Sequence, residues 1–480
     1  MSSLWLDRAA PLGSDELEDG TYDDAVVGAG LTGLATAVLL ARAGRRVVVL
    51  EARHVGAVAT GNTTAKLSLL QGTKLSRILE YQSQDVARAY VEANREGQSW
   101  LLRFCADHGV SVQRRDAVTY APDEATVATA RREHDAAGIL GLDVRWQSDF
   151  DVPFPHRGGA VLPDQAQFDP TDVLAALAVQ VREHGGRIVE RARVLGASLV
   201  GEPHLQLEDG RTVCAHHVVL ATGAPILDRG LYFAKLEADR SYALAFEHPD
   251  PPAAMFLSAG GPTRSVRDFP LSDGSRLLLT GGAGHPVARV SSEAEHVEEL
   301  RAWTERYFPG AVETHSWAAQ DYTSHDGIPY VGKLPRGGGR IYVATGYDKW
   351  GMTNGVAAAL NVSAQLLGGQ LPWARTLGRR ITRPRGAARV LDINARTGVA
   401  ATRALADRVL HPTPEKPPFC THLGGTLKWN DAEQSWDCPL HGSRFDASGK
   451  VLEGPATKRL KQADRAQDDH EPTRASRSRR

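Results

Sequence analysis

The chain has 480 residues, of which 24% are charged, and its formal net charge at pH 7 is −1. This length predicts two or three domains, and the balanced charge gives no reason to expect nucleic acid or a charged membrane surface as a partner. No apolar run reaches the ~18 residues that a membrane-spanning helix needs. Residues 1–22 form a polar, acidic lead-in without the apolar core of a signal peptide, so we expect a cytoplasmic protein.

Residues 23–50 carry the first strong pattern, which predicts a strand, a glycine turn, an Ala/Leu-rich helix and a second strand. Gly28, Gly30 and Gly33 have the spacing of a dinucleotide-binding turn, where glycines permit the tight turn, close approach to a pyrophosphate and close packing of helix on strand. Glu51 follows the second strand, where a carboxylate accepts hydrogen bonds from a ribose. The alternative, a glycine turn in an ordinary α/β protein, is disfavoured by this complete context.

The glycine turn alone does not separate FAD from NAD, but later segments favour FAD. Residues 217–221 predict a strand that ends in Thr-Gly, and residues 341–345 predict another strand that also ends in Thr-Gly. Residues 350–355 then open an Ala-rich helix, whose first N–H groups and dipole would face an electron-rich ligand. These turns supply the candidate cofactor contacts Thr222, Gly223, Gly346, Gly351, Met352 and Thr353.

Taken together, these segments resemble the superfamily of D-amino-acid oxidase, glycine oxidase and sarcosine oxidase over residues 23–370. The resemblance implies an α/β and α+β fold, in which a Rossmann-like FAD-binding domain is interleaved with a substrate domain. It also implies FAD contacts by Thr63, Thr64 and Val194, although a solvated turn for the threonines and core packing for the valine are alternatives. No second fingerprint indicates a nicotinamide domain, because no apolar helix follows the glycines of residues 281–284.

The same resemblance bears on the substrate. In this superfamily a neutral amine passes a hydride to the flavin with little acid–base help, so an amine or amino acid is implied and no catalytic triad is expected. Lys66, Arg240 and Tyr242 are candidates for facing the flavin or the substrate, and Arg240 would pair with a substrate carboxylate. Ordinary surface or core roles remain open for all three, so the catalytic residues stay unassigned.

A second strong pattern lies near the C-terminus, where Cys420 and His422 are followed by Cys438 and His441. Two thiolates suit one iron of a [2Fe–2S] cluster, and two imidazoles on the other iron raise its potential above that of an all-cysteine cluster. A zinc site is the alternative, but Cys₂His₂ zinc sites usually place both cysteines before both histidines. The segment therefore resembles a Rieske cluster-binding domain.

Other positions of this segment can be compared with Rieske domains. Gly425 and Leu440 stand where many of them carry a pair of disulfide-bonded cysteines. Ser443 resembles the serine that bonds a bridging sulfide, whereas Phe445 replaces a tyrosine of high-potential relatives. Fewer hydrogen bonds to sulfur lower the potential of the cluster. Residues 454–456 resemble the proline loop that covers the cluster.

The segment lacks the strands that normally precede the first cluster cysteine. Residues 410–418 are rich in proline, which has no donor N–H and is confined to sheet edges and turns. Upstream of them, residues 399–409 predict a helix. The recognisable module therefore spans only residues 419–460, a size at which domains need a metal or another staple, and the sequence leaves open whether the cluster loads.

The FAD-binding and substrate domains are thus each expected to be assembled from segments that are not continuous in the sequence. Cys105 and Cys214, the two cysteines outside the Rieske segment, are expected to be small buried residues rather than a disulfide. The expected parts are FAD-binding segments 23–80, 155–230 and 320–375, substrate segments 81–154 and 231–319, a basic linker 376–418, a partial Rieske module 419–460 and a charged, disordered tail 461–480.

A flavin oxidoreductase joined to a Rieske-type module resembles a bacterial family of FAD-dependent oxidoreductases with a C-terminal Rieske domain. A flavin accepts two electrons as a hydride equivalent, whereas a [2Fe–2S] cluster carries one. The leading hypothesis is an enzyme that oxidises an amine or amino acid and passes electrons from FAD through the cluster to a one-electron acceptor. A flavin oxidase that uses O₂ and has a vestigial, iron-free Rieske segment is the alternative, and a non-enzymatic redox module is a third hypothesis.

Overall fold

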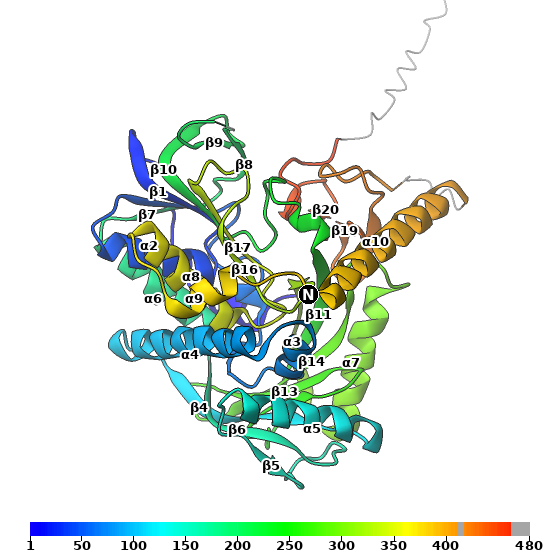
Figure 1. The fold of residues 1–480 in the computed structure, drawn as a ribbon. Coiled ribbons are helices and arrows are strands. Elements are labelled where there is room, and N and C mark those ends of the chain that lie inside the picture. Colours follow the sequence, from blue (N-terminus) through cyan, green and yellow to red (C-terminus); the bar gives the residue numbers. More distant parts are fainter. Residues whose placement is uncertain (199, 411–416, 462–480) are drawn as a thin grey trace, which may run out of the picture.

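Three β-sheets organise the protein in the computed structural model, which describes residues 1–198, 200–410 and 417–461 (Figure 1). The first sheet lies at the upper left of the view, the second lies below it, and the small third sheet with β19 and β20 lies at the upper right. The C-terminal third sheet is thereby placed beside both larger sheets. Within the described residues, no helix has both the length and the apolar character that crossing a membrane requires.

The first sheet is mostly parallel and consists of strongly apolar strands. β1 (Thr21–Val27) pairs in parallel with β2 (Val47–Leu50) and β10 (Thr212–Leu220), and every residue of β2 is buried. Such continuous burial is typical of parallel strands that are covered on both faces. The order is β16-β17-β10-β1-β2-β7 with β8 and β9 beside β10, where β7 is Arg187–Val189, β8 Val194–Ala197, β9 His204–Leu207, β16 Tyr330–Lys333 and β17 Ile341–Thr345.

Three helices pack together beside the first sheet. α2 (Leu31–Arg42) follows the glycine turn and contacts both α6 (Pro170–Glu183) and α8 (Gly351–Leu366). Small residues dominate α2 and α8, so their backbones approach closely. α6 starts with proline at its first position, and the Asp169 carboxylate accepts a hydrogen bond of 2.9 Å from the backbone N–H of Thr171.

The second sheet has the order β15-β11-β14-β13-β12-β4-β6-β3, with β5 beside β6. Its long central strands pair antiparallel, and four helices accompany it. The strands are β3 (Lys66–Leu67), β4 (Val112–Tyr120), β5 (Arg145–Gln147), β6 (Gly159–Phe168), β11 (Leu236–Glu247), β12 (Met255–Ser258), β13 (Arg264–Pro270), β14 (Arg276–Pro286) and β15 (Val312–Ser324); the helices are α3 (Lys74–Tyr81), α4 (Gln84–Asp107), α5 (Glu124–Ile139) and α7 (Glu293–Tyr307).

Sheet membership corrects the predicted boundaries between the two domains. β3 and β6 fall in segments that we assigned to the FAD-binding part, yet β6 pairs with β4 along most of its length and so belongs to the second sheet. β15 crosses the predicted boundary at residue 320 for a similar reason, because it pairs with β11 from end to end. Strand pairing between distant segments, which local pattern does not encode, decides these assignments.

The start of the chain also differs from the predicted polar lead-in over residues 1–22. Residues Leu4–Arg8 form a short helix, α1, in which Leu4 and Trp5 are buried. The Trp5 indole N–H donates a hydrogen bond of 2.6 Å to the carbonyl of Thr63. The N-terminus is therefore part of the packed core near η1 (Thr60–Asn62).

The predicted linker is mostly helical. α9 (Pro372–Gly378) packs against α4, and α10 (Pro384–Leu410) is a long helix of which the predicted helix 399–409 is only the second half. Figure 1 shows α10 running between the second sheet and the C-terminal module. The short helix η2 (Tyr232–Ala234) contacts it.

The C-terminal module, residues 417–461 of the described chain, contains the third sheet. β18 (Lys428–Asn430), β19 (Ser435–Asp437), β20 (Arg444–Asp446) and β21 (Val451–Glu453) form one antiparallel sheet in sequence order. We call residues 417–461 the cluster module. The predicted tail falls on residues 462–480, which lie outside the described residues. The core of the cluster module consists of Cys420, Leu427, Cys438, Phe445, Val451, Ala456 and Leu460.

Candidate functional site

The glycine turn that follows β1 is shaped by contacts that exclude side chains. Gly28 has a φ of +106°, and a Cβ there would lie 2.5 Å from the carbonyl oxygen of Ala221. A Cβ at Gly33 would lie 1.9 Å from the carbonyl oxygen of Gly28, so α2 packs directly on the turn. Gly30 precedes the first residue of α2 and lines a cavity instead. The three glycines thus have the geometry that a pyrophosphate-binding turn requires.

Glu51 lies at the carboxyl end of β2, beside the turn. Its carboxylate accepts hydrogen bonds from the backbone N–H groups of Ala29 (2.8 Å) and Arg53 (2.9 Å). Burial raises the pKa of this carboxyl group. Glu51 also lines the cavity, so its remaining acceptor capacity is directed to where a ribose would lie.

The cavity has a volume of about 730 Å³ and extends from the first sheet to the second. This size suits a dinucleotide and a small substrate. Among the residues predicted from the sequence, Gly33, Gly346 and Thr353 do not line it, and the Thr353 hydroxyl accepts a hydrogen bond from Gln71 instead. The predicted residues that do line it are Gly28, Gly30, Glu51, Thr63, Thr64, Lys66, Val194, Thr222, Gly223, Tyr242, Gly351 and Met352.

The N-terminus of α8 reaches the cavity from the first sheet. Trp350, Gly351 and Met352 line the cavity at the first turn of this helix. The first N–H groups of a helix have no partner within the helix, and its dipole favours negative charge at this end. The site can therefore hold an electron-rich group at this point.

Lys66 is a buried lysine without a carboxylate partner among the described residues. Its ammonium group contacts the Ser265 hydroxyl and lies 3.3 Å from the Thr64 hydroxyl oxygen. Burial, assisted by the charge of Arg267, lowers the pKa of Lys66 to about 7. The lysine can thus change charge near neutral pH, next to the predicted flavin contact Thr64.

Tyr242 forms a buried pair with His285, a residue that the sequence did not single out. His285 Nδ1 lies 3.0 Å from the carbonyl oxygen of Pro286 and must donate to it, so Nε2 accepts the hydrogen bond of 3.0 Å from the Tyr242 hydroxyl. Burial lowers the pKa of His285 to about 4, so the ring stays neutral near pH 7. Both side chains line the cavity and offer it fixed hydrogen-bonding groups.

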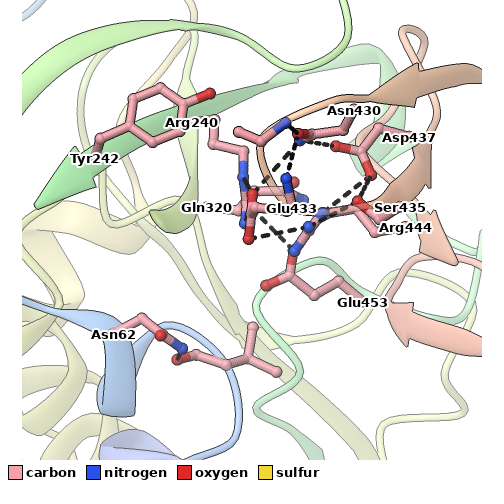
Figure 2. A network of polar contacts seen from close by, with 12 residues as sticks. Asn62, Arg240, Tyr242, Gln320, Asn430, Glu433, Ser435, Asp437, Arg444 and Glu453 are labelled. Atoms are coloured by element: carbon pink, nitrogen blue, oxygen red, sulfur yellow. Dashed lines mark hydrogen bonds and ion pairs between the residues drawn. The ribbon is translucent and has the colours of Figure 1, made fainter. Parts of the chain in front are cut away.

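The position of Arg240 does not support its candidate role in binding a substrate carboxylate. Its guanidinium is buried and contacts Glu433, lies 3.5 Å from the Glu453 carboxylate, and does not line the cavity. Figure 2 shows Arg240 and Arg444 meeting the same two carboxylates. Arg240 therefore joins the second sheet to the cluster module and is not placed to bind a substrate carboxylate.

Charged residues that the sequence analysis missed line the cavity on the side of α3 and α10. Arg389 and Arg396 project from α10 and each lie 3.0 Å from the Glu237 carboxylate. Lys74 lies 3.0 Å from Asp348, which also contacts Arg77. Because these residues come from segments that meet only in the folded chain, no local spacing could have revealed them.

The four predicted cluster ligands come together in the cluster module as two pairs. The Cys420 and Cys438 thiols are buried, and the neighbouring Cys438 thiol lowers the pKa of Cys420 to about 6. The imidazoles of His422 and His441 lie 5.2 Å apart between ring centroids. His441 Nδ1 is buried and has no hydrogen-bond partner among the described residues. A group with open coordination sites would satisfy this nitrogen.

The arrangement fits a cluster of two irons. Two thiols and two imidazoles in separate pairs match the division of ligands between the irons of a Rieske cluster. The His422 Nε2 lies 2.9 Å from Asp228, so its Nδ1 is the nitrogen left for a metal.

The positions around the cysteines that the sequence analysis compared with Rieske domains lie next to them in the structure. A Cβ at Gly425 would lie 2.5 Å from Leu440, so these two positions are in contact and the leucine fills the space between them. The Ser443 hydroxyl oxygen accepts a hydrogen bond of 3.0 Å from the backbone N–H of Ala456 and also hydrogen-bonds to Cys420. Phe445 is fully buried and offers no donor.

The cluster module lacks the strands that normally precede the first cluster cysteine, and it packs instead on residues from the rest of the chain. Asp431 accepts hydrogen bonds from the first N–H groups of α7, at 2.8 Å from Glu293 and 3.0 Å from Ala294. Arg289 donates to the carbonyl of Pro439, at 2.9 Å, beside a cluster cysteine. Further contacts with the module are made by Arg193 with Val451, Thr457 with Leu195, Gln320 with Gly442 and Tyr322 with Gly454.

Comparisons with known proteins point to the same two parts. The model of the FAD dependent oxidoreductase family matches residues 23–365, and the model of the Rieske [2Fe-2S] domain matches residues 417–464. The chain belongs to the FAD dependent oxidoreductase family. This oxidoreductase uses FAD, and its Rieske domain binds a [2Fe–2S] cluster. The predicted enzyme class, fold class and cofactors are thereby confirmed.

Individual relatives agree with these domain matches. YhfW of Bacillus subtilis (strain 168), named as a Rieske 2Fe-2S iron-sulfur protein, is 32% identical over 93% of this chain and 94% of its own length. Cytochrome b6-f complex iron-sulfur subunit 1 of Nostoc sp. is 58% identical over 41 residues, which are 8% of this chain and 23% of that protein.

Solved structures show the fold of the flavin part. Glycine oxidase from Geobacillus kaustophilus has a TM-score of 0.63 at 21% identity and covers 76% of this chain and 100% of its own. L-proline dehydrogenase from P. horikoshii has a TM-score of 0.61 at 17% identity, with 74% and 96% covered.

Proposed function

We propose that this oxidoreductase oxidises the C–N bond of an amine or amino acid and passes the electrons one at a time from FAD through the Rieske cluster to a one-electron acceptor. One observation carries the proposal. The cavity that holds the glycine turn and Glu51 is also lined by Glu453, Gly454 and Ala456 of the cluster module. A two-electron cofactor and a one-electron cofactor that share one cavity wall can convert hydride chemistry into single-electron steps.

The residues of the chain have separate roles in this proposal. FAD, when bound, is the group that accepts the hydride. Gly28 gives the tight turn, since its own N–H donates to the carbonyl of Leu50, Gly30 lets the pyrophosphate approach the backbone, and Glu51 accepts hydrogen bonds from the ribose. The N-terminal N–H groups of α8, at Gly351 and Met352, stabilise negative charge that develops beside them.

The substrate would be oriented by Tyr242 and His285. Because His285 is neutral and accepts from the tyrosine, the Tyr242 oxygen keeps its own acceptor capacity for an N–H group in the cavity. An amine must be neutral to give up a hydride, and no carboxylate is required for that step. The names of the two solved structures of similar fold, a glycine oxidase and an L-proline dehydrogenase, support an amino acid or a related amine as the substrate class.

Anaerobic mixing with a panel of amines and amino acids tests the proposal. We expect flavin bleaching at 450 nm by one member of the panel, followed by the EPR signal of the reduced cluster. Bleaching without any cluster signal, together with rapid reoxidation by O₂, would show a flavin oxidase instead. Bleaching by no amine or amino acid would refute the substrate class.

A further inference from the structure

The loop that carries Cys438 and His441 (residues 438–443, the cluster loop) rests directly on β15, an edge strand of the second sheet, and on its neighbour β11. Gly442 lies in this loop, next to the ligand His441, and has a φ of +78°. A Cβ at Gly442 would lie 2.6 Å from the Cβ of Ala238 on β11 and 2.8 Å from the side-chain nitrogen of Gln320 on β15. Only glycine permits this approach, so the loop and the two strands are in van der Waals contact.

Gln320 spans the layer between the cavity and the cluster loop. Its side-chain N–H₂ donates to the carbonyl of Gly442 at 2.7 Å and to the Tyr322 hydroxyl at 2.8 Å. Tyr322 in turn donates to the carbonyl of Gly454 in the proline loop at 3.2 Å. Gln320 and Tyr322 both line the cavity, because residues two apart on a strand share one face. One layer of side chains therefore separates the cavity from the cluster loop, whereas the proline loop lines the cavity itself.

A buried charge network holds the module in this position. Figure 2 shows this Arg240 network, in which two guanidinium groups meet three carboxylates (Arg240, Glu433, Asp437, Arg444 and Glu453). The side chain of Arg240 is 2% exposed. Removing one partner from a buried network leaves charges without compensation, which is strongly unfavourable. The network therefore resists separation of the module from the second sheet.

The imidazole ligands also face the flavin part of the chain. Asp228 accepts from His422 Nε2 at 2.9 and 3.1 Å. The ring of Phe233 lies 5.3 Å from the His441 ring and 6.2 Å from the His422 ring, measured between centroids. Both ligands are thus enclosed by residues of the flavin part.

We infer that this docked arrangement is itself the electron-transfer arrangement, and that Gln320 is the residue that positions the cluster loop against the flavin cavity. The inference rests on the proposed function. With both cofactors bound, the substrate C–H bond would give a hydride, which is two electrons and one proton, to FAD while a C=N bond forms. The proton released from nitrogen and the proton released on flavin reoxidation would go to solvent. Each of the two electrons would cross the Gln320 layer to the cluster, and a one-electron acceptor outside would take the first before the second follows. No movement of the module is needed between the two transfers.

Flash photoreduction of the flavin in the anaerobic, full-length holoprotein tests this inference. Deazaflavin and light reduce the flavin, and freeze-quench EPR follows the cluster signal in water and in sucrose solutions of rising viscosity. We expect the wild-type rate to be independent of viscosity. Gln320→Leu and Arg240→Gln should each slow the transfer several-fold, because each removes a contact that holds the cluster loop or its module against the second sheet. FAD content and the midpoint potential of the cluster should stay at wild-type values in Gln320→Leu.

Arg145→Gln is the matched control for the two variants. It breaks an exposed ion pair with Asp116 and should transfer electrons at the wild-type rate. If Arg240→Gln does not fold, Gln320→Leu decides alone. A wild-type rate that falls with viscosity, or wild-type rates in both variants, would overturn the inference. A wild-type flavin that never reduces the cluster would instead overturn the proposed function.

Discussion

Individual hydrogen bonds to sulfur determine how readily the cluster accepts an electron. The Ser443 hydroxyl lies within hydrogen-bonding reach of Cys420, whereas Phe445 packs in the core of the cluster module and donates nothing. We expect Ser443→Ala to lower the midpoint potential and Phe445→Tyr to raise it. Each shift should be tens of millivolts and at most about 100 mV, the equivalent of one hydrogen bond to a charged group. EPR spectra recorded along a redox titration measure both potentials.

The flavin serves as the internal control for that pair of variants, because neither residue lines the cavity. Its potential should stay near the wild-type value. Shifts of opposite sign, or no shift in either variant, would mean that Ser443 does not face the sulfur atoms of the cluster. Ser443→Ala also removes the acceptor for the N–H of Ala456, so its cluster content should be checked first.

A second prediction at this scale concerns the glycine turn. A Cβ at Gly30 would meet only the Thr60 hydroxyl, at 3.1 Å, and Gly30 lines the cavity. Gly30→Val should therefore fold but place its methyl groups where the pyrophosphate binds, so we expect loss of FAD with the cluster signal retained. Gly138→Val is the control, because a Cβ at this exposed helix position meets nothing within 4 Å. Full flavin content in Gly30→Val, measured by absorbance, would refute the assigned site.

Among the elements, α7 joins the flavin part to the cluster module through its first turn. Glu293 is buried there, and neither carboxylate oxygen has a hydrogen-bond partner among the described residues. Burial raises the pKa of Glu293 to about 7, above the value of about 4.3 for an exposed glutamate. Between these two pH values the folded chain therefore binds more protons at Glu293 than the unfolded chain does. The free energy of unfolding falls as the pH rises across this range, and above pH 7 the buried, ionised carboxylate destabilises the folded chain.

Glu293→Gln should remove this pH dependence. We expect the variant and the wild type to melt at similar temperatures near pH 4.5. Above pH 7 the variant should be more stable, by at most about 4 kcal/mol. Thermal unfolding followed by fluorescence at a series of pH values measures the difference. Glu295→Gln, at an exposed position of the same helix, should show no such trend, and an equal trend in both variants would contradict the assignment.

The elements also show what the sequence could and could not predict. The glycine turn and the four cluster ligands were predictable, because each set lies in short segments whose geometry depends on local turns. The support of the cluster loop was not, since Ala238 and Gln320 lie far from Gly442 in the sequence. For the same reason, the sequence named Arg240 as a candidate for binding a substrate carboxylate and left a structural role open. Its carboxylate partners come from the cluster module, and a buried ion pair leaves no local pattern.

At the scale of the whole molecule, the cluster module replaces its missing strands with the surface of the flavin part. The module closes one side of the flavin cavity with residues Leu452, Glu453, Gly454, Ala456 and Thr457. This closure has two separable consequences. In the proposed function the cluster offers a route for electrons, and we expect the wall to limit the access of water and O₂ to the flavin.

Two variants separate these consequences. A chain that ends at residue 410 loses both the cluster and the wall, whereas Cys438→Ser loses a cluster ligand but keeps the wall. We expect both to bind FAD, because the glycine turn belongs to the first sheet, and both to lack the cluster's EPR signal. After photoreduction, the shortened chain should be reoxidised by O₂ several times faster than the wild type in stopped-flow absorbance. Cys438→Ser should be reoxidised more slowly than the shortened chain, and equal rates in the two variants would show that the module does not shield the flavin.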